Sequence, residues 1–129
     1  MKIEAIRPAE AHRTMGYSPA VRVGNTLYIS GQVPKDGTDR VVGIEDFDAQ
    51  VGQVFANLRA VLKAGGGDFA NVVKLTTYLT RRDQFEAWRR MRAEAFGVEP
   101  LPASTLVVVS GLSNADFLVE IEAIAVLDD

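Results

Sequence analysis

The chain has 129 residues, a hydrophobic share of 47%, a charged share of 24% and a formal net charge of −3. We expect residues 1–129 to form a single compact domain, because the length suits one core and the composition excludes intrinsic disorder. The apolar runs are too short to span a bilayer, and the negative charge argues against nucleic acid as a partner. The chain has no cysteine and one histidine, His12, so we expect no metal and no cofactor.

The first third of the chain carries strand signals. Residues 1–8 lack the apolar core of a secretory signal, so we expect a cytoplasmic location. Apolar residues then alternate with polar ones on both sides of Gly24-Asn25, a pair that tolerates turn dihedrals. This pattern predicts a hairpin, followed by a turn at Pro34-Lys35-Asp36-Gly37.

The middle of the chain changes to a helical period. From Asp46 the apolar positions predict one helix stripe made of Phe47, Val51, Val54, Phe55, Leu58, Val61 and Leu62. The run Gly65-Gly66-Gly67 is expected to end this helix, and we reject a phosphate-loop interpretation because the glycines do not open a helix.

The second half predicts a strand, a helix and two more strands. A β-rich strand covers 71–79, and a helix over 83–96 is expected to have Asp83 as its N-cap and Gly97 as its stop. The run Leu106-Val107-Val108-Val109 in the strand 104–110 predicts burial on both faces, whereas the strand 118–126 alternates. This order of elements predicts an α+β two-layer sandwich, with helices on one face of a sheet.

Several motifs carry a family resemblance. Pro102-Ala103-Ser104-Thr105-Leu106-Val107, together with Val119-Glu120-Ile121-Glu122, resembles the Pro-Ala-Arg-Ser/Thr and Val-Glu-Ile-Glu signature of the Rid (YjgF/L-PSP endoribonuclease-like) family. The segments 16–21, 27–34, 57–62 and 72–76 are similar to further blocks of that family. The resemblance implies a chorismate-mutase-like fold with one mixed sheet, assembled as a homotrimer with small-molecule clefts between subunits.

By this resemblance the cleft is lined by Tyr17, Gly31, Glu120 and the segment Ser104, Thr105 and Leu106. In the family's imine deaminases the signature arginine grips the substrate carboxylate, and a tyrosine or glutamate positions water. Ser104 replaces that arginine here, which places the chain in an arginine-lacking subgroup, and no hydroxyl substitutes for a guanidinium fork.

The residues alone leave alternatives open at each position. Glu120 is either a catalytic carboxylate or a solvated strand residue, and Tyr17 is either functional or a cap on the core edge. Arg89 and Arg92 lie beside the apolar stripe of the second helix, and Arg89 is the favoured replacement for the missing anchor, against a role as a surface arginine.

These features predict a metabolite-binding protein that catalyses hydrolytic deamination of an enamine or imine, or a related water addition, with Glu120 and Tyr17 as catalytic residues and Gly31, Arg89, Ser104, Thr105 and Leu106 in binding. We expect little turnover of 2-iminopropionate. The alternatives are a binding or sensing trimer without catalysis and, from the family's historical label, an endoribonuclease.

Overall fold

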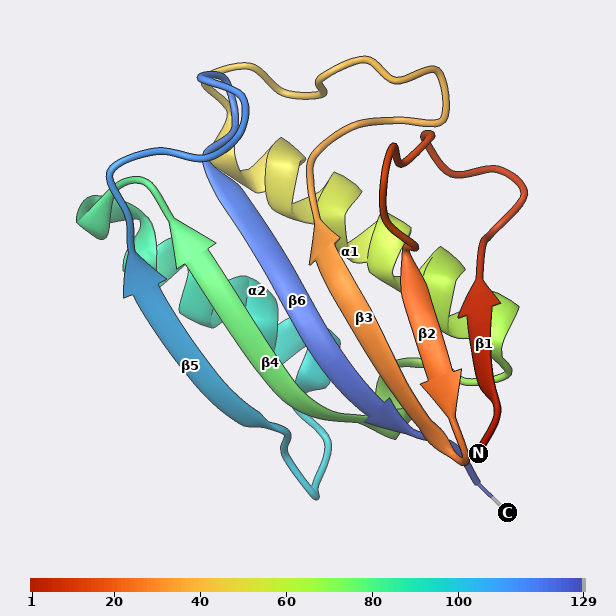
Figure 1. Ribbon diagram of the computed structural model, residues 1–129. Helices are drawn as coiled ribbons and strands as arrows, with labels where there is room; N and C mark the ends of the chain where they lie inside the picture. The colour runs from red at the N-terminus through yellow and green to blue at the C-terminus, as the bar shows by residue number, and fades with distance from the viewer. Residues whose placement is uncertain (129) are drawn as a thin grey trace.

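The computed structural model describes residues 1–128, and its strands form one six-stranded mixed sheet. The strands are β1 (Ile3–Ile6), β2 (Ala20–Val23), β3 (Thr26–Gln32), β4 (Val72–Leu79), β5 (Ala103–Val108) and β6 (Val119–Val126). They lie in the order β1-β2-β3-β6-β4-β5, with β4 and β5 parallel and the other neighbours antiparallel. The helices α1 (Phe47–Gly65) and α2 (Phe85–Phe96) lie on one face and leave the other face open (Figure 1). The predicted α+β two-layer sandwich is confirmed.

The helix α1 supplies most of the core against β3 and β6. Its N-cap Asp46 accepts a hydrogen bond from the Ala49 amide at 3.1 Å, and Gly66 ends it in the left-handed conformation with φ 96°. The predicted stripe is confirmed: six of its seven residues are buried, and Phe55 is partly buried against the same core.

The helix α2 begins later than the sequence predicts. A short 3₁₀ turn over Arg82–Gln84 precedes it, Gln84 is its N-cap, and no side chain caps it. Asp83 is therefore not the cap, because its carboxylate pairs with Arg81 at 2.7 Å instead. On the inner face of α2, Trp88 is fully buried and Phe96 nearly so.

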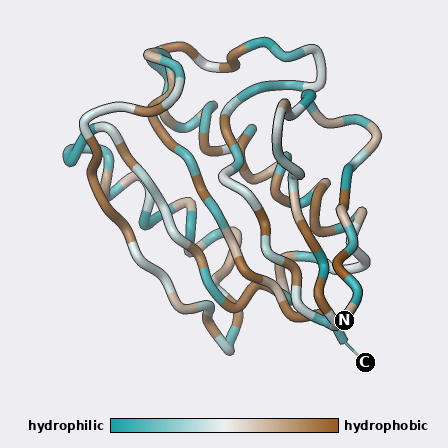
Figure 2. The backbone as a smooth tube through the Cα atoms, in the orientation of Figure 1, coloured by the Kyte–Doolittle hydropathy of each residue, from teal (hydrophilic) through white to brown (hydrophobic). Residues whose placement is uncertain are grey.

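The strand β5 is not buried on both faces. It lies at the edge of the sheet with β4 as its one neighbour, and Val107 and Val108 are 40% and 44% exposed. Figure 2 shows the hydrophobic stretch of β5 at this uncovered edge. The prediction is wrong because a continuous apolar run is typical both of a central strand and of an edge that another protein surface covers.

The strand β1 was absent from the predicted order of elements. It has four residues, of which Ile6 alone is buried, and it pairs with β2. So short a segment with exposed apolar residues carries no clear period. Within residues 1–128, no helix is long and apolar enough to cross a membrane.

Candidate functional site

The open face of the sheet brings Gly31 of β3 against Glu120 of β6. The alternation of β6 buries Val119 and Ile121 against the helices and so turns Glu120 to the open side. The register of β3 with β6 shifts between Ile29 and Gln32, which marks a bulge at Gly31. A Cβ at position 31 would overlap the Glu120 carboxylate and lie 2.8 Å from its Cδ. Glycine at position 31 therefore provides the room for this carboxylate.

Buried polar side chains of α1 hold both strands in place. Asn57 donates to the carbonyls of Val33 and Lys35 at 2.9 and 2.8 Å, and these carbonyls lie two and four residues after Gly31. Gln50 donates to the Asp116 carbonyl at 2.8 Å and accepts from the Leu118 amide at 2.8 Å, at the entry to β6. The sequence analysis missed both, because a polar residue in a helix stripe shows no signal of which distant loop it binds.

Glu120 has the electrostatics of a proton-transfer group. Burial raises the pKa of its carboxyl above the ordinary 4.5, and the nearby carboxylate of Glu122 adds to the rise. Among residues 1–128, no side chain or backbone group forms a hydrogen bond or ion pair with the Glu120 carboxylate. A partly buried, unpaired carboxyl with a raised pKa holds a proton to higher pH than a solvated glutamate does, which suits a group that accepts and returns a proton.

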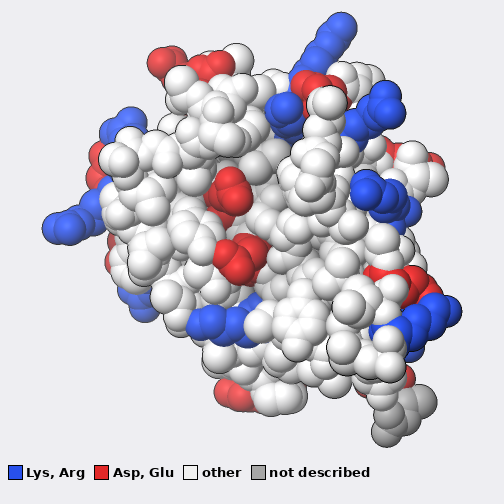
Figure 3. Space-filling view, in the orientation of Figure 1, with Lys and Arg blue, Asp and Glu red and all other residues white. Residues whose placement is uncertain are grey.

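Tyr78 and Glu122 form a second polar pair on the same face. The Tyr78 hydroxyl donates to Glu122 Oε1 at 2.5 Å, and this bond raises the pKa of the phenol. Tyr78 is also the partner of Glu120 in the register of β4 with β6. Figure 3 shows the resulting acidic groups in the middle of the open face, with most basic side chains around its rim. The partner of Glu122 is thus a tyrosine from a strand far along the chain, which no local pattern identifies.

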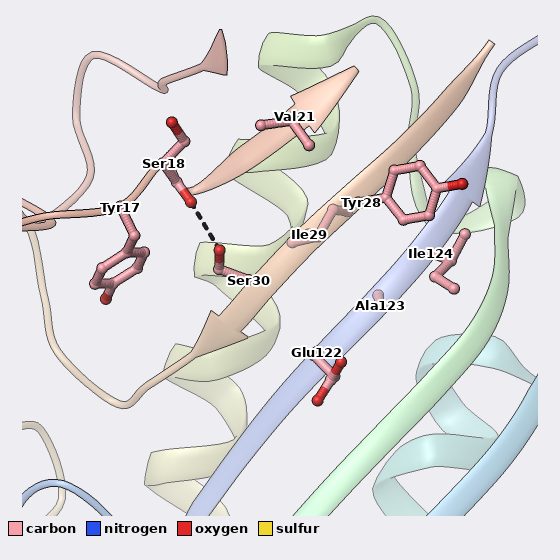
Figure 4. Close-up of a pocket in the computed structure, with 9 residues that line it drawn as sticks. All are labelled: Tyr17, Ser18, Val21, Tyr28, Ile29, Ser30, Glu122, Ala123 and Ile124. Carbon is pink, nitrogen blue, oxygen red and sulfur yellow. Dashed lines mark hydrogen bonds between the residues drawn. The ribbon is translucent and has the colours of Figure 1, made fainter. Parts of the chain in front are cut away.

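Tyr17 lies beside a hollow on the open face of about 420 Å³ (Figure 4). The Ser30 hydroxyl ties the Tyr17 loop to β3, because it donates to the Ser18 carbonyl at 2.7 Å. The lining residues are Tyr17, Ser18, Val21, Tyr28, Ile29, Ser30, Glu122, Ala123 and Ile124. The hollow thus brings Tyr17 to the face that carries Glu120, although Glu120 itself does not line it.

The segment Ser104, Thr105 and Leu106 lies elsewhere. Ser104 pairs in register with the buried Leu75, so its side chain lies on the helix side of the sheet, as does that of Leu106. Thr105 points to the open side, where its hydroxyl accepts from Lys74 Nζ at 2.5 Å.

The helix arginine that contacts Ser104 is Arg92 and not Arg89. Arg92 Nη1 donates to Ser104 Oγ at 3.3 Å. Arg89 donates to Glu86 at 3.2 Å and lies 5.7 Å from the centre of the Phe85 ring. A role of Arg89 in ligand binding stays a prediction, whereas the contact with position 104 belongs to Arg92.

Within one chain, the predicted site residues form two separate groups. The strands β6 and β4 lie between β3 and β5, which places Gly31 roughly 14 Å from β5 at the usual strand spacing. Ser104 and Glu120 also lie on opposite faces of the sheet. Among residues 1–128, no three His, Asp or Glu side chains are grouped as metal ligands.

Known proteins resemble this chain over nearly its whole length. The family model described as Endoribonuclease L-PSP matches residues 7–127. A RutC family protein from Pyrococcus horikoshii is 40% identical over 123 residues, which cover 95% of this chain and 96% of that protein. A 2-iminobutanoate/2-iminopropanoate deaminase from Dermatophagoides farinae is 37% identical, over 87% of this chain and 86% of that protein.

A solved structure shares the fold as well as the sequence. RidA from an Antarctic Psychrobacter species superposes with a TM-score of 0.88 at 37% identity, over 96% of this chain and 99% of that one. Its agreement with the sheet order and helix placement supports the same conclusion as the family match. The chain belongs to the Rid (YjgF/L-PSP endoribonuclease-like) family.

Proposed function

We propose that this protein is a hydrolase that adds water to an imine or enamine of a small metabolite, in clefts formed between the subunits of a homotrimer. The observation that carries the proposal is the approach of Gly31 to Glu120, which leaves a partly buried carboxyl with a raised pKa unpaired on the open face. The deaminase relative from Dermatophagoides farinae supports the reaction class.

Glu120 acts as the general base and then the general acid. The imine binds in its protonated form, and the Glu120 carboxylate takes a proton from water as the water oxygen bonds to the imine carbon, while the electrons of the carbon–nitrogen double bond become a lone pair on nitrogen. The Glu120 carboxyl gives this proton to the nitrogen, and the carbon–nitrogen bond then breaks as the hydroxyl oxygen forms the carbonyl and loses its proton to the Glu120 carboxylate. The carbonyl product leaves, and ammonia leaves with the proton that Glu120 holds. Such proton transfer is typically worth about 10²–10⁴ in rate. Tyr17 orients the water or the substrate from the loop before β2.

The separation of the two groups of site residues supports clefts between subunits. A ligand cannot contact Glu120 and Ser104 of one chain together, because they lie on different strands and opposite faces. A head-to-tail interface that closes into a ring would place the β5 edge of one subunit beside the open face of the next. The exposed Val107 and Val108 on that edge are the kind of apolar surface that an assembly covers.

Ser104 distinguishes this chain from the arginine-bearing members of its family, and we assign it to an arginine-lacking subgroup. A hydroxyl at position 104 supplies no charge for a substrate carboxylate. The smallest 2-imino acids, which have little apolar surface of their own, depend most on that charge. We therefore expect poor turnover of 2-iminopropionate.

The test is ammonia release from imines generated in situ by an amino acid oxidase, measured above spontaneous hydrolysis. The imine formed from phenylalanine should be hydrolysed at least tenfold faster than that formed from alanine, and Glu120→Gln should reduce turnover about 100-fold or more. Rapid hydrolysis of the alanine-derived imine would contradict the subgroup assignment. Ligand binding with no turnover of any imine would show that the protein binds metabolites without catalysis. Salt-sensitive cleavage of RNA would show that it is an endoribonuclease.

A further inference from the structure

Arg92 and Ser104, whose side chains contact each other, both line a hollow of about 440 Å³ between α2 and the segment that leads into β5. The lining residues are Arg92, Ala93, Phe96, Gly97, Leu101, Pro102 and Ser104. Apart from the guanidinium and the hydroxyl, these side chains are apolar or absent. The hollow thus joins one cation and one hydroxyl to an apolar interior.

Arg92 differs from the other arginines of α2 in its partners. Arg89 pairs with Glu86 at 3.2 Å, and Arg90 pairs with Asp48 at 2.9 Å. No carboxylate of residues 1–128 lies within 4.0 Å of the Arg92 guanidinium, and its hydrogen-bond partner is the neutral Ser104 hydroxyl. Arg92 therefore keeps a positive charge that no carboxylate of residues 1–128 neutralises, on a side chain that lines the hollow.

We propose that Arg92 and Ser104 form a carboxylate-binding site, and that the adjoining hollow selects ligands whose carboxylate carries a bulky apolar group. The inference rests on the proposed function, because the carboxylate bound here is that of the substrate. It adds that Arg92 takes the role of the family arginine, and that the substrate carries a bulky apolar group.

The hydrogen bonding of the pair suits a carboxylate. Ser104 Oγ accepts from Arg92, which leaves the hydroxyl hydrogen free to donate to an anion, while the guanidinium retains further N–H donors. An arginine at position 104 would bring a second guanidinium beside Arg92, and the like charges would repel. Serine at position 104 and arginine at position 92 are thus compatible as a pair.

The size of the hollow indicates what accompanies the carboxylate. A volume of about 440 Å³ lies within the range of small-molecule sites, and it exceeds what a methyl group fills. Phe96 and Pro102 form rigid walls that suit a flat or branched apolar group. A ligand with a carboxylate and a ring would use both parts, whereas propionate would use the charge alone.

Calorimetric titration tests this directly with non-reactive probes at low salt. The intact protein should bind 3-phenylpropionate at least tenfold more tightly than propionate, which lacks the ring, and than 3-phenylpropionamide, which lacks the charge. Arg92→Ala should weaken 3-phenylpropionate binding at least tenfold, and Arg90→Ala, the matched control on the same helix whose guanidinium pairs with Asp48, less than twofold. Equal effects of the two variants, or no binding to the intact protein at millimolar concentrations, would overturn the inference.

A second pair of variants tests the hollow. Ala93→Phe should fill it and weaken 3-phenylpropionate binding at least tenfold, whereas Ala56→Phe on the exposed side of α1 should leave binding unchanged. Unchanged binding in Ala93→Phe would overturn the assignment of the apolar part. Titration measures binding and not turnover, so the two proposals fail separately. Binding without ammonia release would contradict the proposed function alone. Turnover that Arg92→Ala leaves unchanged would contradict this inference alone.

Discussion

The open face around Glu120 and the edge region around Ser104 differ in charge, burial and origin. The first is acidic and is built by β3, β4 and β6 in the middle of the sheet. The second is cationic and is built by α2 and the edge strand β5. A hydrolytic site needs a proton carrier and a ligand anchor, and each region supplies one of them. Under the proposed function, the two regions are half-sites that a second copy of the chain would complete.

Assemblies that mix Glu120→Gln and Arg92→Glu subunits give the largest expected effect, and they test whether the two regions act in one site. Glu120→Gln and Arg92→Glu should each reduce kcat/KM about 100-fold or more, because one removes the proton carrier and the other repels the carboxylate. In a head-to-tail ring of three subunits that contains both variants, one of the three sites between subunits combines an intact Glu120 with an intact Arg92. We therefore expect ammonia release to recover to about a third of the wild-type rate.

Differently tagged variants, refolded together and purified for both tags, are the material for this measurement. Separately refolded variants mixed afterwards are the control and should stay inactive. Assemblies that stay as inactive as their parents would show that the two groups do not share one site.

Gly31→Ala has an intermediate effect and sharpens the account of the open face. The new Cβ would push the Glu120 carboxylate aside, which is cheap for the fold because the carboxylate is the end of a flexible side chain. We expect kcat to fall about tenfold with a change in unfolding free energy below about 1 kcal/mol. In the Glu120→Gln background the same change should have almost no further effect on kcat. If the losses of kcat in the two variants were additive, Gly31 would not act through Glu120.

The pH dependence of stability gives the smallest effect. Because the folded-state pKa of Glu120 is raised, its contribution to stability is complete below the ordinary 4.5 and is lost as the pH rises through the folded value. Glu120→Gln removes that loss, so at pH 7.5 it should melt about 1–3 °C above the wild type, since solvent screens a partly exposed group.

At pH 4 the two proteins should melt together in a scanning calorimetry experiment. Glu122→Gln is the matched control, because it replaces the charged acceptor of the Tyr78 hydroxyl by a neutral amide oxygen and should not raise the melting temperature. A lower melting temperature for Glu120→Gln at pH 7.5 would show that the carboxylate has a stabilising partner.

Local patterns predicted the elements that are long and regular. The stripe of α1, its glycine stop and the alternation of β6 were readable because each depends on neighbours a few residues away. The start of α2 could not be predicted, because Asp83 pairs with Arg81 and does not cap the helix. The strand β1 could not be predicted, because four residues, of which only Ile6 is buried, show no period. The run Leu106–Val109 misled because consecutive apolar residues occur both in buried central strands and at sheet edges, and the run alone does not distinguish the two.

The sequence by itself determined the family and the two-layer fold. These depend on residue types and short spacings, which a single chain displays. Only the tertiary structure decided that Gly31 makes room for Glu120, that Tyr78 pairs with Glu122, and that Arg92 and not Arg89 reaches Ser104. Strand register and helix rotation decide such contacts, and they follow from the packing of the whole core, which no local pattern contains.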